Sequence, residues 1–139
     1  MAIGANCGVG ASELVATVLG ISEARPDAAI VAKGNCGIPY YDEGQIRYNG
    51  TPALMAEYAK LVRDAGARLI GGCCGTSPEH LAAIRGALDS HQPGERPSVE
   101  AIVSRLGPLT SNIAANLNAE SPAAGEGGRR GRRRQAGSQ

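Results

Sequence analysis

The stretch Arg68-Leu69-Ile70-Gly71-Gly72-Cys73-Cys74-Gly75-Thr76-Ser77-Pro78 decides the fold class of this 139-residue chain. Its first five residues are typical of a β-strand that ends in glycine. Ser77 is a good helix N-cap, and Pro78 suits the first helical position, where its missing N–H costs nothing. A strand therefore passes through two cysteines directly into a helix, which is the βα arrangement of an α/β protein.

The same alternation of strand and helix occurs twice upstream. The apolar run at 28–32 is typical of a strand buried on both faces, and Ser12 is the expected N-cap of the preceding helix, which leaves Glu13 as a solvated charge. Thr51 and Pro52 begin the next helix, whose connections have the length that parallel crossovers need. The predicted order is strand 2–7, helix 13–24, strand 28–32, irregular segment 34–50, helix 52–65, strand 68–72 and helix 78–88.

The composition restricts which residues can form the core and indicates the cellular compartment. Aromatic residues make up only 3% of the chain, with no Trp or Phe, so the core must be built from Ala, Val, Leu and Ile. No apolar stretch is long enough to span a membrane, and the amino terminus lacks the features of a secretion signal. We therefore expect a cytoplasmic protein without a membrane partner, in which the four cysteines are reduced.

The charges are unevenly distributed. The net charge is +1, but five arginines lie in the last eleven residues; without the tail from Glu120 onward, nine basic residues face eleven acidic ones. The remainder is thus near −2 and lacks a basic surface, which argues against a nucleic-acid partner. A competing interpretation is a binding module whose basic tail carries the function.

Three cysteines follow predicted strands, at the edge where α/β proteins place their sites. Adjacent cysteines on a regular strand would point to opposite faces, so the backbone must bend for Cys73 and Cys74 to converge, and the flanking glycines allow this. Cys7 ends a strand two units earlier and can reach the same rim. Three thiolates with one open position are typical of a reactive Zn²⁺ site for a thiol substrate. The alternative is that all three thiols are small buried apolar groups.

Two motifs resemble those of the homocysteine S-methyltransferases: Gly4-Ala5-Asn6-Cys7, and Gly71-Gly72-Cys73-Cys74-Gly75-Thr76 with its proline-started helix. The resemblance implies a (β/α)₈ TIM barrel and Zn²⁺ bound by Cys7, Cys73 and Cys74. It further implies homocysteine as the methyl acceptor, methionine as the product and a small methyl donor such as betaine, S-methylmethionine or a methylated folate or cobalamin.

A third segment, 33–39, also matches the family. It implies that Asn35, with Asn6 of the first motif, binds substrate or fixes the loops. Cys36 stands where the family usually has a small residue, so it is not expected to be a ligand. A structural zinc protein in which Cys36 closes a four-cysteine site is the alternative function.

A barrel of this kind needs about 250 residues, so the resemblance implies a fragment. Residues 1–92 would be the last three βα units, 93–118 a linker with a short helix over 99–106, and 119–139 a disordered Gly/Arg-rich tail. The amino-terminal part of the barrel would then be needed in cis or in trans. Without it, we expect the chain to be poorly stable and inactive.

Overall fold

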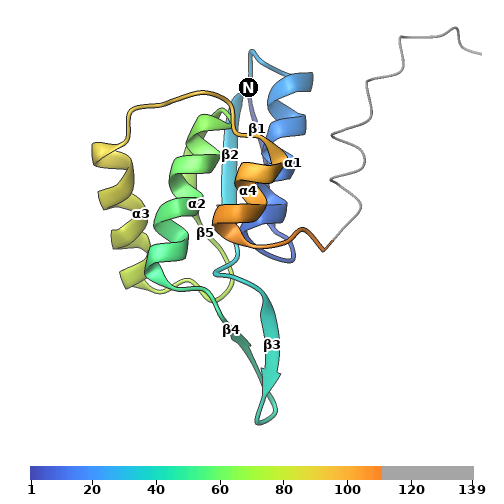
Figure 1. The fold of residues 1–139 in the computed structure, drawn as a ribbon, viewed down its shortest axis with the longest axis vertical. Helices are drawn as coiled ribbons and strands as arrows, with labels where there is room; N and C mark the ends of the chain where they lie inside the picture. Colours follow the sequence, from blue (N-terminus) through green and yellow to red (C-terminus); the bar gives the residue numbers. More distant parts are fainter. Residues whose placement is uncertain (111–139) are drawn as a thin grey trace, which may run out of the picture.

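The computed structural model describes residues 1–110 of the chain, which form a mixed α/β structure. Three parallel strands make a sheet in the order β1-β2-β5, and two antiparallel strands, β3 and β4, make a separate hairpin (Figure 1). This confirms the predicted α/β class. The elements are β1 (Ala2–Cys7), α1 (Ala11–Ala24), β2 (Ala29–Gly34), β3 (Pro39–Asp42), β4 (Gln45–Tyr48), α2 (Pro52–Asp64), β5 (Ala67–Gly72), α3 (Pro78–Ser90) and α4 (Val99–Leu106).

The core lies between the sheet and the helices. Helix α1 contacts β1 and β2, while α2 and α3 contact β5. Along β2, Ile30 and Ala32 are buried, whereas Lys33 on the alternate face is exposed. Most core side chains are Ala, Val, Leu and Ile, as the composition predicts, joined by Met55 and Tyr58.

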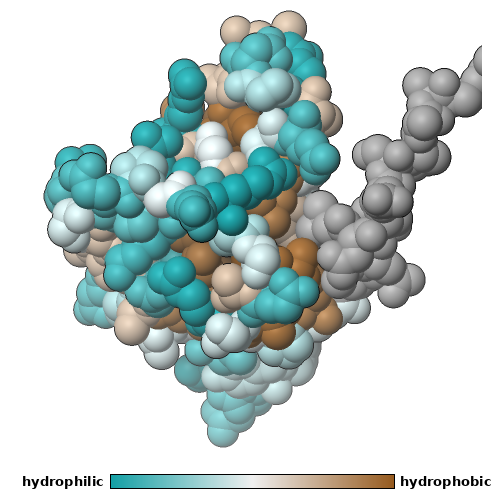
Figure 2. Space-filling model, turned by 45° about the horizontal axis from the view of Figure 1, so that its top comes forward, coloured by the Kyte–Doolittle hydropathy of each residue, from teal (hydrophilic) through white to brown (hydrophobic). Residues whose placement is uncertain are grey.

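The prediction that the second strand is buried on both faces is wrong for the part of the chain that the structure describes. Val31 is only half-buried, and Leu69 beside it on β5 is 54% exposed. Within residues 1–110, the helices that contact the strands leave this face uncovered. Apolar residues also reach the surface among hydrophilic ones on the side drawn in Figure 2.

The starts of two helices follow the predicted capping chemistry. The Thr51 hydroxyl accepts a hydrogen bond from the Leu54 N–H at 3.1 Å at the start of α2. Ser77 caps α3, and its backbone N–H donates to Nδ1 of His80, which completes a capping box. Proline occupies the first position of both helices.

The predicted start of α1 is wrong. The helix begins at Ala11 after Gly10, so Ser12 lies inside the first turn and is buried. Glu13, expected in solvent, is only 5% exposed, and its carboxylate accepts hydrogen bonds from the backbone N–H and the hydroxyl of Thr110. A segment distant in sequence therefore covers the amino-terminal end of α1.

The segment predicted as irregular contains the β3–β4 hairpin, which projects from the body of the molecule (Figure 1). Its loop is the dipeptide Glu43-Gly44, with φ angles of 46° and 82°. Positive φ at both positions is the conformation of a type I′ turn, whose twist suits a hairpin.

Helix α4 occupies the span predicted for a short helix. It packs on α1 and α2, with Ile102 and Leu106 buried, and Arg105 forms an ion pair with Glu57 of α2 (Figure 1). Of the helices within residues 1–110, none has the length and hydropathy of a membrane span. The predicted disordered tail, 119–139, lies outside the described residues.

Candidate metal centre

Three of the four cysteines come together at the carboxyl ends of β1 and β5. The distances between sulfur atoms are 2.9 Å for Cys7 and Cys73, 3.6 Å for Cys7 and Cys74, and 3.8 Å for Cys73 and Cys74. All are far longer than the bond of about 2.05 Å in a disulfide, and all four cysteines are free. In residues 1–110 no other group of three His, Cys, Asp or Glu side chains could hold a metal ion.

The two adjacent cysteines converge because the chain leaves the strand at Gly72. The Cys73 N–H still donates a hydrogen bond to the carbonyl oxygen of Gly34 on β2 at 2.8 Å. The chain then turns, and the Thr76 N–H donates to the carbonyl oxygen of Cys73. Gly75 has a φ of 76°, which closes the turn. The bend predicted from the surrounding glycines is therefore present.

Cys7 has an unusual backbone conformation. Its φ is 62°, in the left-handed region that residues other than glycine rarely adopt. Gly8 follows with a φ of 86°, so the chain turns sharply at the end of β1. Strained residues of this kind cost about 1–3 kcal/mol and cluster at functional sites. The turn brings the Cys7 sulfur toward the cysteine pair.

Asn35 connects the two cysteine loops. Its side-chain oxygen accepts a hydrogen bond from the Cys74 N–H at 3.3 Å, and its side-chain nitrogen donates to the carbonyl of Gly8 at 2.6 Å. The side chain is buried, at 4% exposure. The next residue, Cys36, donates its N–H to the carbonyl of Cys74 at 3.0 Å. The loop after β2 therefore supports both thiol-bearing turns.

Cys7 and Cys73 differ in how readily they ionise. A hydrogen bond with Cys7 lowers the pKa of Cys73, and the Asn6 side chain lowers it further by a weaker hydrogen bond. Hydrogen bonds with Cys73 and Cys74 raise the pKa of Cys7 to about 11. In the metal-free cluster, Cys73 is therefore expected to ionise at lower pH than Cys7.

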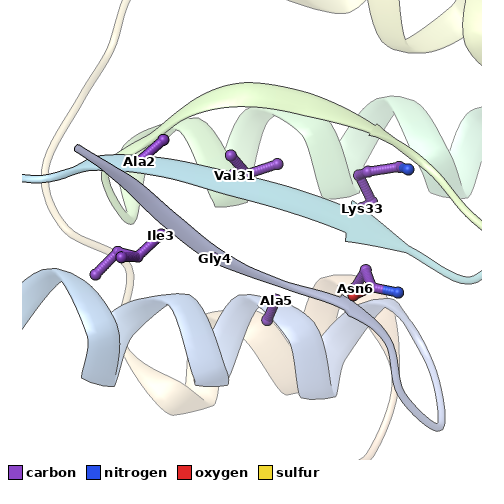
Figure 3. A pocket seen from close by; sticks show the side chains of 7 residues that line it. All are labelled: Ala2, Ile3, Gly4, Ala5, Asn6, Val31 and Lys33. Carbon is purple, nitrogen blue, oxygen red and sulfur yellow. The ribbon is translucent and has the colours of Figure 1, made fainter.

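Asn6, predicted to bind substrate or fix the loops, and Cys36, expected not to be a ligand, lie in different surroundings. Asn6 is exposed on the uncovered face of the sheet, where it pairs in register with Lys33, and both line a shallow pocket of about 370 Å³ (Figure 3). Cys36 is 1% exposed and packs in the core, outside the group of three sulfurs.

Sequence reasoning missed Tyr48, the last residue of β4. Its ring lies against Gly75, because a Cβ atom at that glycine would stand 2.4 Å from Cγ of Tyr48. Burial raises the pKa of Tyr48, and a hydrogen bond with the Cys74 side chain raises it further. The signal that could have found it is the hairpin turn at Glu43-Gly44, which folds the chain back toward the cysteines.

Comparison with known proteins agrees with the resemblance that the two cysteine motifs carry. Methionine synthase of Mycobacterium leprae is 30% identical to this chain over 122 residues, which cover 86% of this chain and 10% of that protein. The chain thus spans about a tenth of the length of this relative. The model of the homocysteine S-methyltransferase family matches residues 1–88, which is more than half of the chain. The chain therefore belongs to this family.

Proposed function

We propose that this protein takes part in transferring a methyl group to the thiol of homocysteine, forming methionine, at a Zn²⁺ ion held by Cys7, Cys73 and Cys74. Membership of the family supports methyl transfer to homocysteine in general terms. The observation that carries the proposal is the convergence of three sulfur atoms to within 4.8 Å of one another at the ends of two strands.

The sulfur positions are compatible with zinc. Tetrahedral coordination with Zn–S bonds of about 2.3 Å separates the sulfurs by about 3.8 Å. The distances from Cys74 to Cys7 and Cys73, 3.6 and 3.8 Å, are close to this value, and the 2.9 Å between Cys7 and Cys73 must lengthen by about 1 Å. That change is small for two thiols at the ends of turns.

The chain's own residues prepare the site for a thiol substrate. Cys74 is exposed and the other two thiols are half-buried, so a substrate can approach the sulfurs from solvent. When bound, Zn²⁺ would lower the pKa of a substrate thiol while the thiolate ligands keep its sulfur nucleophilic. The homocysteine thiol would lose its proton to solvent on binding; its sulfur then forms the new bond to the methyl carbon as the bond from that carbon to the donor breaks, and the electron pair of the broken bond leaves with the donor.

Asn6 and Asn35 are proposed to act in different ways. Asn6 is exposed beside Cys73 and faces the shallow pocket, so it is the better placed to contact homocysteine. Asn35 uses both ends of its amide to bond backbone atoms of the cysteine loops. Its effect on substrate would therefore pass through the positions of the thiols.

We further propose that residues 1–92 are three βα units of a (β/α)₈ barrel whose other units are supplied in cis or in trans. Parallel strands with helices on one side are compatible with this arrangement. The exposed face of β1 and β2 would then line the inside of the barrel. Within residues 1–110, β1 pairs only with β2, so its second edge is available to another strand.

X-ray absorption at the zinc edge of the full chain, with and without homocysteine, tests the proposed chemistry. The expected first shell has three sulfur atoms and one light atom, and homocysteine should convert it to four sulfur atoms. A four-sulfur shell that homocysteine leaves unchanged would contradict the proposal and support a closed structural site. The Cys36→Ala variant is the matched control, because it should give the same spectra as the parent chain.

A further inference from the structure

We propose that Lys33 determines which thiols the cysteine site accepts: its ammonium group binds the carboxylate that homocysteine carries at the end opposite its thiol, and the side-chain amide of Asn6 supports this contact. The inference rests on the proposed function, because it needs the substrate sulfur at the three cysteines. It goes beyond that function by assigning one part of the substrate to a residue of β2 that lies outside both cysteine motifs.

Lys33 lies near the end of β2, next to the row of residues that leads into the cysteines. In the register of the sheet it stands between Asn6 of β1 and Gly71 of β5, and the next row contains Cys7 and Gly34. Neighbouring rows are about 3.3 Å apart along parallel strands. Lys33 and Asn6 share one face of the sheet and line the shallow pocket, near the carboxyl ends of their strands (Figure 3).

The stem of Lys33 lies beside the strand that carries the cysteine pair. An added Cβ at Gly71 would be 3.9 Å from Cγ of Lys33, which is ordinary van der Waals contact. Gly71 precedes Cys73 by two residues, which is about 7 Å along a strand. A lysine ammonium is a compact charge with three donors on a flexible stem. It can therefore follow a carboxylate that is joined to a metal-bound sulfur by a short carbon chain.

Lys33 has no anionic partner in the part of the chain that the structure describes. Its side chain is exposed, and it takes part in none of the ion pairs within residues 1–110. The strands β1, β2 and β5 contain no Asp or Glu, and their charged residues are Lys33 and Arg68. None of the residues that line the pocket is acidic. The pocket therefore presents a positive charge that is available to an anion.

This charge pattern distinguishes between the two charged groups of an amino-acid thiol. A carboxylate in the pocket would accept charge-assisted hydrogen bonds from Lys33 and a further bond from the amide of Asn6. An ammonium group in the same place would meet a like charge and no acid. A substrate whose sulfur lies at the cysteines should therefore direct its carboxylate, and not its ammonium, toward β2. The partner of the ammonium is then not supplied by β1, β2 or β5.

Binding of three small thiols to the Co²⁺-loaded full chain tests the assignment. Of the two charged groups of homocysteine, γ-mercaptobutyrate keeps only the carboxylate and aminopropanethiol only the ammonium, while propanethiol is uncharged. Cobalt absorption reports the dissociation constant of each thiol without turnover. We expect the preference for γ-mercaptobutyrate over aminopropanethiol, as a ratio of dissociation constants, to fall about tenfold in Lys33→Met relative to the parent chain. Comparing this ratio between chains cancels the differences between the free thiols.

Two further variants serve as controls. Lys33→Arg should retain the preference, because a guanidinium also binds carboxylates. Arg68→Met removes the other exposed cation of the sheet, about 16 Å from Cys73 along β5, and should leave the preference unchanged. Propanethiol should bind equally to all four chains, because it has no charged group for Lys33 to contact.

The outcomes separate this role from the proposed function. If the parent chain binds Co²⁺ and propanethiol but Lys33→Met leaves the preference unchanged, the role of Lys33 is refuted and the metal site stands. An equal fall in Arg68→Met also refutes it, because the general charge of the sheet would then explain the preference. If the parent chain binds neither Co²⁺ nor any thiol, the proposed function fails and the role of Lys33 fails with it. Should Lys33→Met lose propanethiol as well, the ratio measured in Lys33→Gln decides instead.

Discussion

The side-chain oxygen of Asn35 accepts a hydrogen bond from the backbone N–H of Cys74 at 3.3 Å. The nitrogen of the same amide donates to the carbonyl of Gly8, directly after Cys7, at 2.6 Å. One buried side chain on the loop after β2 therefore sets the spacing between two thiol-bearing turns that are distant in sequence. Neither turn could shift alone without breaking one of these bonds.

Replacing Asn35 with alanine should weaken both the fold and the metal site. Leaving a buried donor or acceptor unsatisfied costs about 1–3 kcal/mol, which urea unfolding would measure, and zinc affinity should fall because the thiols lose their spacing. Asn35→Asp keeps the acceptor for Cys74 and loses the donor to Gly8. Its stability and its zinc affinity should therefore lie between those of Asn35→Ala and the parent chain. Gln45→Ala, on the exposed hairpin, is the control; unchanged zinc binding in Asn35→Ala would contradict the assignment.

Single alanine substitutions of the cysteines should divide them into two classes. We expect Cys7→Ala, Cys73→Ala and Cys74→Ala each to lose bound zinc, because two sulfurs hold the ion too weakly. Cys36→Ala should retain one zinc ion per chain, since Cys36 lies outside the group of three sulfurs. Elemental analysis of the purified variants measures this, and loss of zinc from Cys36→Ala would support the closed four-cysteine site.

Alkylation of the metal-free protein should follow the order of the thiol pKa values. The pKa of Cys73 is lowered by its hydrogen bond with Cys7, so Cys73 should be labelled at lower pH than Cys7. Cys7, with a pKa raised to about 11, should stay protonated through neutral pH and react only in strongly alkaline solution. Iodoacetamide labelling with peptide mass analysis measures both rates; equal pH profiles for the two cysteines would be inconsistent with this order.

Gly75→Ala should destabilise the protein and disturb the metal site. A φ of 76° is unfavourable for alanine, and the new Cβ would meet the Tyr48 ring at 2.4 Å; strain of this kind costs about 1–3 kcal/mol. Gly20→Ala is a matched control, because the space around this helical glycine is open. That change should stabilise the chain by about 0.5–1 kcal/mol. Thermal unfolding and zinc titration of both variants give the comparison.

The parts of the fold that sequence patterns predicted are those set by local chemistry. The glycines before Cys73 indicated the end of a strand and a bend, and Thr51-Pro52 and Ser77-Pro78 marked two helix starts correctly. At the start of α1, Ser12 was a plausible cap, and the cap prediction was wrong. Glu13 is buried because its carboxylate bonds to Thr110, a residue distant from it in the described chain. No local pattern reports such a contact.

In the candidate site, too, some features follow from local sequence and others depend on contacts between distant segments. The convergence of Cys7, Cys73 and Cys74 follows from their positions after parallel strands, because these ends meet at one edge of a sheet. The contribution of Tyr48 was missed, since it depends on a hairpin whose turn at Glu43-Gly44 was not recognised. The dual bonding of Asn35 likewise required the relative placement of two loops.

The left-handed backbone at Cys7 makes this position sensitive to the choice of replacement. Alanine removes the sulfur and keeps the steric conflict between Cβ and the following carbonyl, whereas glycine removes both. We expect the unfolding free energy of Cys7→Gly to exceed that of Cys7→Ala by about 1 kcal/mol. This difference measures the cost of the left-handed backbone conformation at position 7. If Cys7 binds Zn²⁺ as proposed, the metal–sulfur bond offsets the free energy lost to this strained backbone, and a cysteine at a left-handed position then has a physical reason.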